Sequence, residues 1–420
     1  MGPILICDKS TLQSLNPSEL NALRKYYSLN IPPVLLVEIL GDLKKHANSQ
    51  AGREEVRILA NKLMPACSTV NTNFRELIRG ELTGVASFPM DGRPVLTGGK
   101  HVISPEGKKG VIFEISPEAE ALLRWQTGKF REAEELMAEA WRLSTLTIDL
   151  ESMQRQLRGT YSGKLNLQTL ASTAKFVDDL MSTVAPDLLL IWFLQDIIGM
   201  FGEKAIQAVQ KFRNATPGSL NSTAPYTAYC VRAALIFHFA LAFGLVSTRP
   251  TNRIDLEYLY YVPFCNAFSS GDTFHRKMAS LVIRDQMYAD RDELKADLKQ
   301  LADWWSKLTN EQREEESPTS GPPENEKSVT HRAWQKVMRP GYRERSRQKL
   351  KPPPEGFKSV ADWKQLVDTS TPMNQPMQED DCDFMIVKHS VRLDGPCICG
   401  GEKLFKDCCG RGIAESVAKQ

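Results

Sequence analysis

The first residues of the chain carry its clearest strand signal. Pro3–Cys7 is a short, continuous apolar run, typical of a strand that a parallel sheet buries on both faces. The pattern then predicts one helix that begins near Asn16 or Ser18, either of which can cap it. A second helix is predicted to begin at Pro32, with a stripe of leucines along one side. The N-terminus is therefore predicted to form a buried parallel strand followed by helices.

Helical spacing of apolar residues dominates the middle of the chain. Residues 50–245 are predicted to be mainly helical, except for 84–116, where repeated Gly and Pro predict short strands or an ordered loop. Beyond this region, the pattern predicts a helix from Asp255 to about Val262, a short strand over Asn266–Ser270 and a further helix. The sequence contains no internal repeat and no phosphate-binding glycine loop.

The last quarter of the chain differs in composition. Residues 306–394 are rich in Pro and charge, so they bury too little apolar area to offset their ordering entropy. We expect this tail to be mostly extended, with Trp334 and Trp363 able to anchor short helices. Residues 395–412 form a compact, Cys-rich terminus.

Overall composition narrows the class of protein. Apolar residues make up 42% and charged residues 25%, which suits a chain with a buried core and excludes a fibre or a wholly disordered chain. The 53 Lys and Arg nearly balance the 51 Asp and Glu, so any basic surface must be local.

The location of the protein follows from its apolar runs and its cysteines. Residues 188–201 and 233–246 are too short to cross a membrane, and we expect neither a membrane span nor a signal peptide. The nine cysteines are odd in number, and four of them lie within thirteen residues near the C-terminus, which favours a metal site in a reducing compartment. We therefore expect a cytoplasmic protein.

Four carboxylates lie where a predicted strand ends or near the start of a predicted helix: Asp8, Glu38, Asp255 and Asp272. Residues after the ends of parallel strands converge at one edge of a sheet. Converging carboxylates repel by about 4 kcal/mol per pair at 4 Å, unless a cation neutralises them. Mg²⁺ or Mn²⁺ takes such oxygen ligands, and a water bound to it can attack a phosphodiester.

Each acid also has a structural explanation. Asp255 and Asp272 can cap helices, and Glu38 with Asp42 can form a solvated helix face. Asp8 is the hardest to explain in this way, because a carboxylate directly after a buried strand is costly without a partner.

Taken in order, the segments that carry the acids resemble one family. They are the apolar strand with Asp8-Lys9-Ser10, Glu38-Ile39-Leu40, Arg253-Ile254-Asp255-Leu256-Glu257-Tyr258, and Ala267-Phe268-Ser269-Ser270-Gly271-Asp272. This order resembles the PIN-like ribonucleases. The resemblance implies a doubly wound parallel α/β fold, a Mg²⁺ or Mn²⁺ site formed by the four acids, and cleavage of single-stranded RNA. It also implies that Ser10, or Thr11, fills the hydroxyl position after the first acid.

The match to this family is interrupted. It covers about 1–45 and 248–300 of a core that spans 1–305, and residues 50–245 would be a large, mainly helical insertion. His275 can contact phosphate near the site or serve a structural role. Further candidate ligands are Asp42, Asp187 and Asp196.

The terminal cysteines have the spacing of a zinc knuckle. Cys397, Cys399, Cys408 and Cys409 offer four thiolates for tetrahedral Zn²⁺, and Gly400-Gly401 allows a tight turn. The segment resembles the SEC-C zinc motif, although Gly401 and Glu402 stand where Ser and Gly are usual. This resemblance implies a structural zinc and docking to a protein or ribosome partner.

A basic stretch precedes the knuckle. Residues 331–351 contain Trp334, Tyr342 and one acid, and could follow an RNA backbone and stack on bases, or could be a charged linker. The basic residues are Arg332, Lys336, Arg339, Arg343, Arg345, Arg347, Lys349 and Lys351.

These observations lead to one main hypothesis and two alternatives. The main hypothesis is a metal-dependent endoribonuclease that acts on single-stranded or structured RNA and carries a zinc docking tag. The first alternative is a non-catalytic adaptor, in which the insertion and the knuckle bind partners and the acids are helix caps. The second is a phosphohydrolase that uses the same acids on a smaller substrate.

Overall fold

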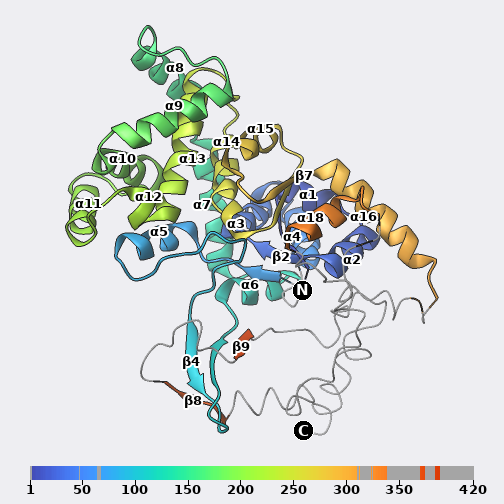
Figure 1. Cartoon of the computed structure of the whole chain (residues 1–420). Helices are drawn as coiled ribbons and strands as arrows, with labels where there is room; N and C mark the ends of the chain where they lie inside the picture. The colour runs from blue at the N-terminus through green and yellow to red at the C-terminus, as the bar shows by residue number, and fades with distance from the viewer. Residues whose placement is uncertain are drawn as a thin grey trace.

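The computed structural model describes residues 2–46, 48–63, 68–309, 312, 323, 325–337, 369–373 and 384–387 (Figure 1). The four cysteines of the predicted zinc knuckle lie outside these ranges, so that site remains a prediction. The same holds for Arg339, Arg343, Arg345, Arg347, Lys349 and Lys351 of the basic stretch.

A five-stranded, all-parallel sheet confirms the predicted α/β class. Its order is β3-β2-β1-β6-β7, and β1 is central. From β1 the chain adds β2 and then β3 on one side of the sheet. It later adds β6 and β7 on the other side of β1, so the direction of winding reverses between β1 and β6. The strands are β1 (Ile4–Cys7), β2 (Ser28–Ile31), β3 (Ser68–Val70), β6 (Ala267–Ser270) and β7 (Met287–Asp290).

Helices connect and cover these strands. Of the two residues predicted as possible caps of α2, Asn16 is the cap, and it forms a capping box with Glu19; α3 begins at Pro33. The helices next to the sheet are α1 (Lys9–Ser14), α2 (Pro17–Tyr26), α3 (Pro33–Gly41), η1 (Asp42–Lys44), α4 (Ser49–Lys62), α14 (Asn252–Leu259), η4 (Val262–Phe264), α15 (Thr273–Val282) and α16 (Arg291–Ser306).

Most of residues 50–245 is helical, but β3 lies in this range and belongs to the main sheet. In Figure 1 the helices from α8 to α12 lie around α13, on the side of the molecule away from α16. Nearly every residue of α13 is buried, so it forms the core of this helical part. The elements are α5 (Phe74–Leu82), α6 (Pro117–Trp125), α7 (Glu132–Leu146), α8 (Leu150–Tyr161), α9 (Leu170–Thr183), α10 (Pro186–Phe193), the π-helical turn η3 (Leu194–Ile198), α11 (Glu203–Ala215), α12 (Leu220–Thr223) and α13 (Pro225–Ala242).

A second, smaller sheet has the order β8-β4-β5-β9. Its centre is the antiparallel hairpin of β4 (Gly99–Ile103) and β5 (Lys109–Phe113), inside the Gly- and Pro-rich region predicted to hold short strands. The hairpin extends away from the main body in Figure 1 and pairs with β8 (Thr371–Pro372) and β9 (Phe384–Val387).

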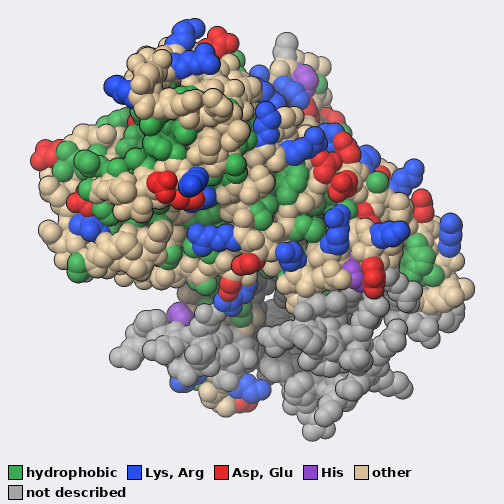
Figure 2. Space-filling model, turned by 45° about the horizontal axis from the view of Figure 1, so that its top comes forward, with side chains coloured by type: hydrophobic (Ala, Val, Ile, Leu, Met, Phe, Trp, Pro, Cys, Tyr) green, Lys and Arg blue, Asp and Glu red, His purple; other side chains and the backbone are tan. Residues whose placement is uncertain are grey.

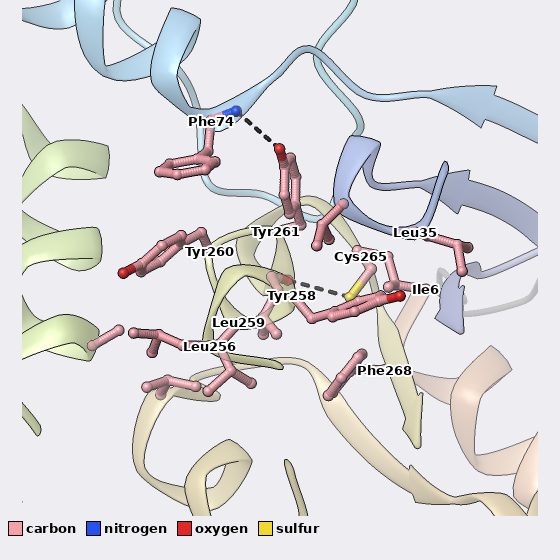
Figure 3. Packing of buried hydrophobic residues seen from close by; sticks show 14 of the residues in the cluster. Ile6, Leu35, Phe74, Leu256, Tyr258, Leu259, Tyr260, Tyr261, Cys265 and Phe268 are labelled. Atoms are coloured by element: carbon pink, nitrogen blue, oxygen red, sulfur yellow. Dashed lines mark hydrogen bonds between the residues drawn. The ribbon is translucent and has the colours of Figure 1, made fainter. Parts of the chain in front are cut away.

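The segment that leads into β6 is fixed by a buried aromatic cluster. Figure 3 shows Tyr258, Tyr260 and Tyr261 beside Phe74 of α5 and Phe268 of β6. The Tyr261 hydroxyl accepts a hydrogen bond of 2.9 Å from the Phe74 backbone N–H. This packing fixes the end of α14 and the segment after it against α5 and β6.

Part of the tail is folded rather than extended. Residues Val329–Val337 form α18, and Trp334 is buried, with its Nε1 3.1 Å from the backbone oxygen of Tyr26. Trp334 therefore anchors a short helix, as expected, but it cannot stack on bases, because its ring is enclosed by the protein. Arg332 and Lys336 lie on the exposed side of this helix.

Over the described ranges, no helix combines the length and the apolar character that a bilayer crossing requires. Figure 2 shows Lys and Arg side chains interspersed with Asp and Glu on the face in view, in keeping with the near balance of charge.

Candidate functional site

All four predicted acids line a single cavity of about 370 Å³, which we name the acidic pocket. It lies at the carboxyl ends of β1 and β6, where the winding of the sheet reverses and ligands usually bind in such folds. Ser10 and Asp42 also line it. Asp187 and Asp196 are not among its lining residues, and Asp187 instead pairs with Arg213 at 2.9 Å.

Asp8 follows β1 directly and is held by several donors. Its Oδ1 accepts the Thr11 backbone N–H at 2.8 Å, which caps α1. Both carboxylate oxygens lie 2.9 Å from the Ser10 hydroxyl, and Oδ2 lies 2.5 Å from the Ser270 hydroxyl. Burial would raise the pKa of Asp8, but its interactions with His275, Ser270 and Thr11 hold that pKa below its usual value.

His275 is fully buried beneath the acids, and its hydrogen bonds fix its protonation. Its Nε2 lies 2.8 Å from the backbone oxygen of Asp255, which can only accept, so Nε2 carries a proton. Ser270 donates its one hydroxyl proton to ionised Asp8, so the His275 Nδ1, 2.8 Å from Ser270 Oγ, must carry a proton as well. His275 is thus a cation. It cannot reach a substrate, so its role is structural.

The same arrangement raises the pKa of His275. Burial lowers that pKa, but the nearby Asp8 carboxylate and the charge and carbonyl of Asp255 outweigh burial. Nδ1 lies 3.7 Å from Asp8 Oδ2. The site therefore contains its own internal positive charge.

Glu38 and Asp255 are the acids that capping does not explain. Glu38 lies in the middle of α3 and accepts a hydrogen bond from the Tyr258 hydroxyl; burial raises its pKa. Asp255 lies inside α14, whose N-cap is Thr251. The Asp255 side chain is 8% exposed, and its Oδ2 has no hydrogen-bond partner among the described residues.

The pKa of Asp255 is raised to about 7. Burial is the main cause, and the charges of Glu38 and Asp272 raise it further, against a lowering effect of His275. Glu38 and Asp272 therefore lie close enough to Asp255 to repel it. Such a carboxyl group is costly unless a ligand uses it.

Asp272 is both a helix cap and one half of an ion pair. Its Oδ1 accepts the Phe274 backbone N–H at 2.7 Å, which caps α15. Its Oδ2 accepts a hydrogen bond of 2.9 Å from Arg249 Nη1. The capping explanation is therefore correct for Asp272 and Asp8, and it is wrong for Asp255.

Basic and aromatic residues complete the acidic pocket. Lys9 pairs with Asp42 at 2.6 Å and donates to the backbone oxygen of Glu38. Trp141, on α7, packs on Gly41, where an added Cβ would lie 2.7 Å from Trp141 Cδ1. The helical part thus supplies one wall of the pocket. Other lining residues are Lys45, Arg142, Thr145 and Arg249.

Oxygen donors suitable for a hard divalent cation gather here, but they are not arranged as ligands. Across the described ranges, no three His, Cys, Asp or Glu side chains are grouped so as to hold a metal ion. Glu38, Asp8 and Asp272 instead accept hydrogen bonds from protein donors, while the buried Asp255 Oδ2 accepts none from the residues that the structure describes. The residues therefore fit Mg²⁺ or Mn²⁺ in donor chemistry, and ligation would have to displace some of these hydrogen bonds.

Of the two candidates for the hydroxyl position, only Ser10 lines the acidic pocket. The Ser10 side chain lines the pocket, donates to Asp8 and accepts the Gly271 backbone N–H at 3.2 Å, so it joins the first turn of α1 to the loop after β6. Thr11 is fully buried and cannot contact a substrate.

In the basic stretch, Arg332 lies 3.7 Å from Glu293 on α16, and its role in RNA binding remains a prediction.

Several residues of the site were not predicted from the sequence. Tyr258 and Ser270 stand inside the segments that carry the acids, but the sequence gives no sign that they bind Glu38 and Asp8. Lys9 and Arg249 are found only through the fold, because each pairs with an acid contributed by another part of the chain.

No protein-family model, curated protein or solved structure matches this chain. The resemblance to PIN-like ribonucleases and to the SEC-C motif therefore depends on the residues themselves, and what it implies is proposed below.

Proposed function

We propose that this protein is a divalent-metal-dependent ribonuclease with a PIN-like core. The observation that carries the proposal is the position of Asp255. This buried carboxylate has an oxygen without a hydrogen-bond partner among the described residues, and it shares a pocket with the three other predicted acids. Helix capping explains Asp8 and Asp272, but it explains neither Asp255 nor Glu38. A cation would relieve the repulsion between Asp255 and its neighbours.

The residues that would hold the ion are Asp8, Glu38, Asp255 and Asp272. When bound, Mg²⁺ or Mn²⁺ supplies an activated water and neutralises charge on the phosphate. His275 keeps Asp8 ionised and fixed through Ser270. The exposed side chain of Arg249 and the half-buried side chain of Arg142 line the pocket and can bind phosphate oxygens, and the half-buried Trp141 offers a ring for a base.

RNA is favoured over a small phosphate ester because both cationic and aromatic side chains line the pocket beside the acids, and an RNA strand offers phosphates and bases to contact them. The zinc knuckle and the basic stretch would then guide the enzyme to a partner or an RNA. The alternative is a non-catalytic adaptor, which the capping roles of Asp8 and Asp272 favour.

Cleavage of a labelled single-stranded RNA with Mn²⁺ tests the proposal. Asp272→Asn should abolish cleavage, because an amide is a poor metal ligand, while it still caps α15 and leaves stability within about 1 kcal/mol of wild type. Asp187→Asn, outside the pocket, should cleave like wild type. Equal cleavage by wild type and Asp272→Asn, or no cleavage by wild type, would favour the adaptor.

A further inference from the structure

A second cavity of about 260 Å³ adjoins the acidic pocket, and its role is not explained by the four acids. Arg249 and Asp272 line both cavities, so their 2.9 Å ion pair stands at the boundary between them. On the far side, the second cavity is lined by Ser247, Thr273 and Lys277. A ligand that extends past Arg249 from the acidic pocket would therefore enter the second cavity.

The polar groups of the second cavity suit an anion. Ser247 and Thr273 are exposed and carry hydroxyls, and Lys277 is exposed, with no carboxylate within ion-pair distance among the described residues. The Arg249 side chain is 57% exposed and gives one N–H to Asp272, and a guanidinium has further donors. Hydroxyl, ammonium and guanidinium groups are the usual partners of phosphate oxygens.

Asp272 is the one acid among the described residues that line the second cavity, and it does not prevent an anion from binding there. Both of its oxygens are engaged, one by the Phe274 N–H and the other by Arg249. The acidic pocket, in contrast, contains several carboxylates and repels a polyanion. Positive charge placed just outside it would offset that repulsion for a substrate with more than one phosphate.

We propose that the second cavity binds the phosphate adjacent to the scissile one in a single-stranded RNA, with Arg249 in contact with the backbone between the two. This inference rests on the proposed function, which places the scissile phosphate in the acidic pocket. Lys277 is then a substrate-binding residue, and the enzyme requires an oligonucleotide rather than a mononucleotide.

The test is the salt dependence of binding of a short single-stranded RNA, measured without added Mg²⁺ or Mn²⁺ so that the RNA stays intact. Each phosphate contact to a single strand contributes about 0.7 to the slope of log K against log salt concentration. Lys277→Gln should reduce the magnitude of the slope by about 0.7. The matched control is Arg276→Gln, on the same helix, which removes the same charge from an exposed residue that pairs with Asp290 and lines neither cavity.

An unchanged slope for Lys277→Gln, or an equal decrease for Arg276→Gln, would overturn the inference. Inorganic phosphate is the second probe: if it stabilises wild type more than Lys277→Gln while the RNA slopes are equal, the cavity takes free phosphate and the inference is wrong. The proposed function is tested separately by cleavage. A slope that depends on Lys277 without any Mn²⁺-dependent cleavage would reject the nuclease and keep the phosphate site.

Discussion

Ser270 Oγ lies 2.5 Å from Asp8 Oδ2, so the last residue of β6 donates a hydrogen bond to the residue that follows β1. The two residues are 262 positions apart in the sequence and meet where the winding of the sheet reverses. Asp8 also caps α1 through Thr11. One carboxylate therefore joins both central strands and orients a helix, and the geometry of the pocket depends on it.

Replacing Ser270 by Ala should destabilise the protein. The change removes a hydrogen bond to ionised Asp8 and leaves the His275 Nδ1–H without its acceptor, so we expect a loss of about 2 kcal/mol in the free energy of unfolding. Urea denaturation measures this loss. Ser280→Ala is the control, since Ser280 is exposed on α15 and bonds only its own helix. Losses of similar size for the two variants would contradict the role of Ser270.

His275 should make stability depend on pH in one direction. Its pKa is raised in the folded protein above the ordinary value of 6.5, so its contribution is complete below pH 6.5 and is lost as the pH rises through the folded pKa. The free energy of unfolding of wild type minus that of His275→Gln should therefore decrease from pH 6.5 upward. Denaturant titrations between pH 5.5 and 9 measure it. A difference that stays constant or grows with pH would show that His275 is not a buried cation.

Asp255 should lower stability at neutral pH when no metal is added. The pKa of Asp255 rises from 3.8 to about 7 on folding, so the folded protein binds the Asp255 proton more tightly than the unfolded chain does. The contribution of Asp255 to the free energy of unfolding therefore decreases as the pH rises from about 4 to 7. Asp255→Asn removes this loss, and we expect it to be more stable than wild type at pH 7.5 by about 1 to 3 kcal/mol.

The matched control for this measurement is Asp187→Asn. Asp187 is about half exposed and forms a surface ion pair with Arg213, so its loss should change stability by less than about 1 kcal/mol. If Asp255→Asn is instead less stable than wild type, the carboxylate has a protein partner and is not held for a ligand.

Zinc content tests the terminal motif. We expect about one Zn²⁺ per chain, bound by Cys397, Cys399, Cys408 and Cys409. Changing Cys397 and Cys399 to Ser should remove the metal and leave the main body folded, because the body has its own core. Cys382→Ser is the control and should retain zinc. Freshly purified wild type without zinc would rule out the knuckle.

The sequence predicted strands β1 and β6 but not β2, β3 and β7, for physical reasons. β1 and β6 are uninterrupted runs of small or apolar residues, and burial on both faces requires such runs. β3 is a three-residue, mainly polar edge strand, β7 is an edge strand that ends in Asp290, and β2 contains Asn30. Asn30 is tolerated in the sheet because its amide donates a hydrogen bond of 2.8 Å to the backbone oxygen of Phe264, a contact between distant segments.

The site also contains some residues that the sequence predicts and others that only the folded structure shows. The acids could be found because each follows a strand or lies at a helix, which is a local pattern. The groups that set their chemistry could not, since Arg249 reaches Asp272 and Tyr258 reaches Glu38 only after the chain has folded. Likewise, His275 is a cation only because Ser270 and the Asp255 carbonyl leave it no other protonation.

Direct measurement of Mn²⁺ binding, without RNA, tests the central claim that these acids form a metal site. Electron paramagnetic resonance follows the signal of free Mn²⁺ during titrations of wild type, Asp255→Asn and Asp187→Asn. We predict that wild type and Asp187→Asn take up Mn²⁺ alike, and that Asp255→Asn binds it at least tenfold more weakly. Equal uptake by wild type and Asp255→Asn, or none by either, would contradict the account.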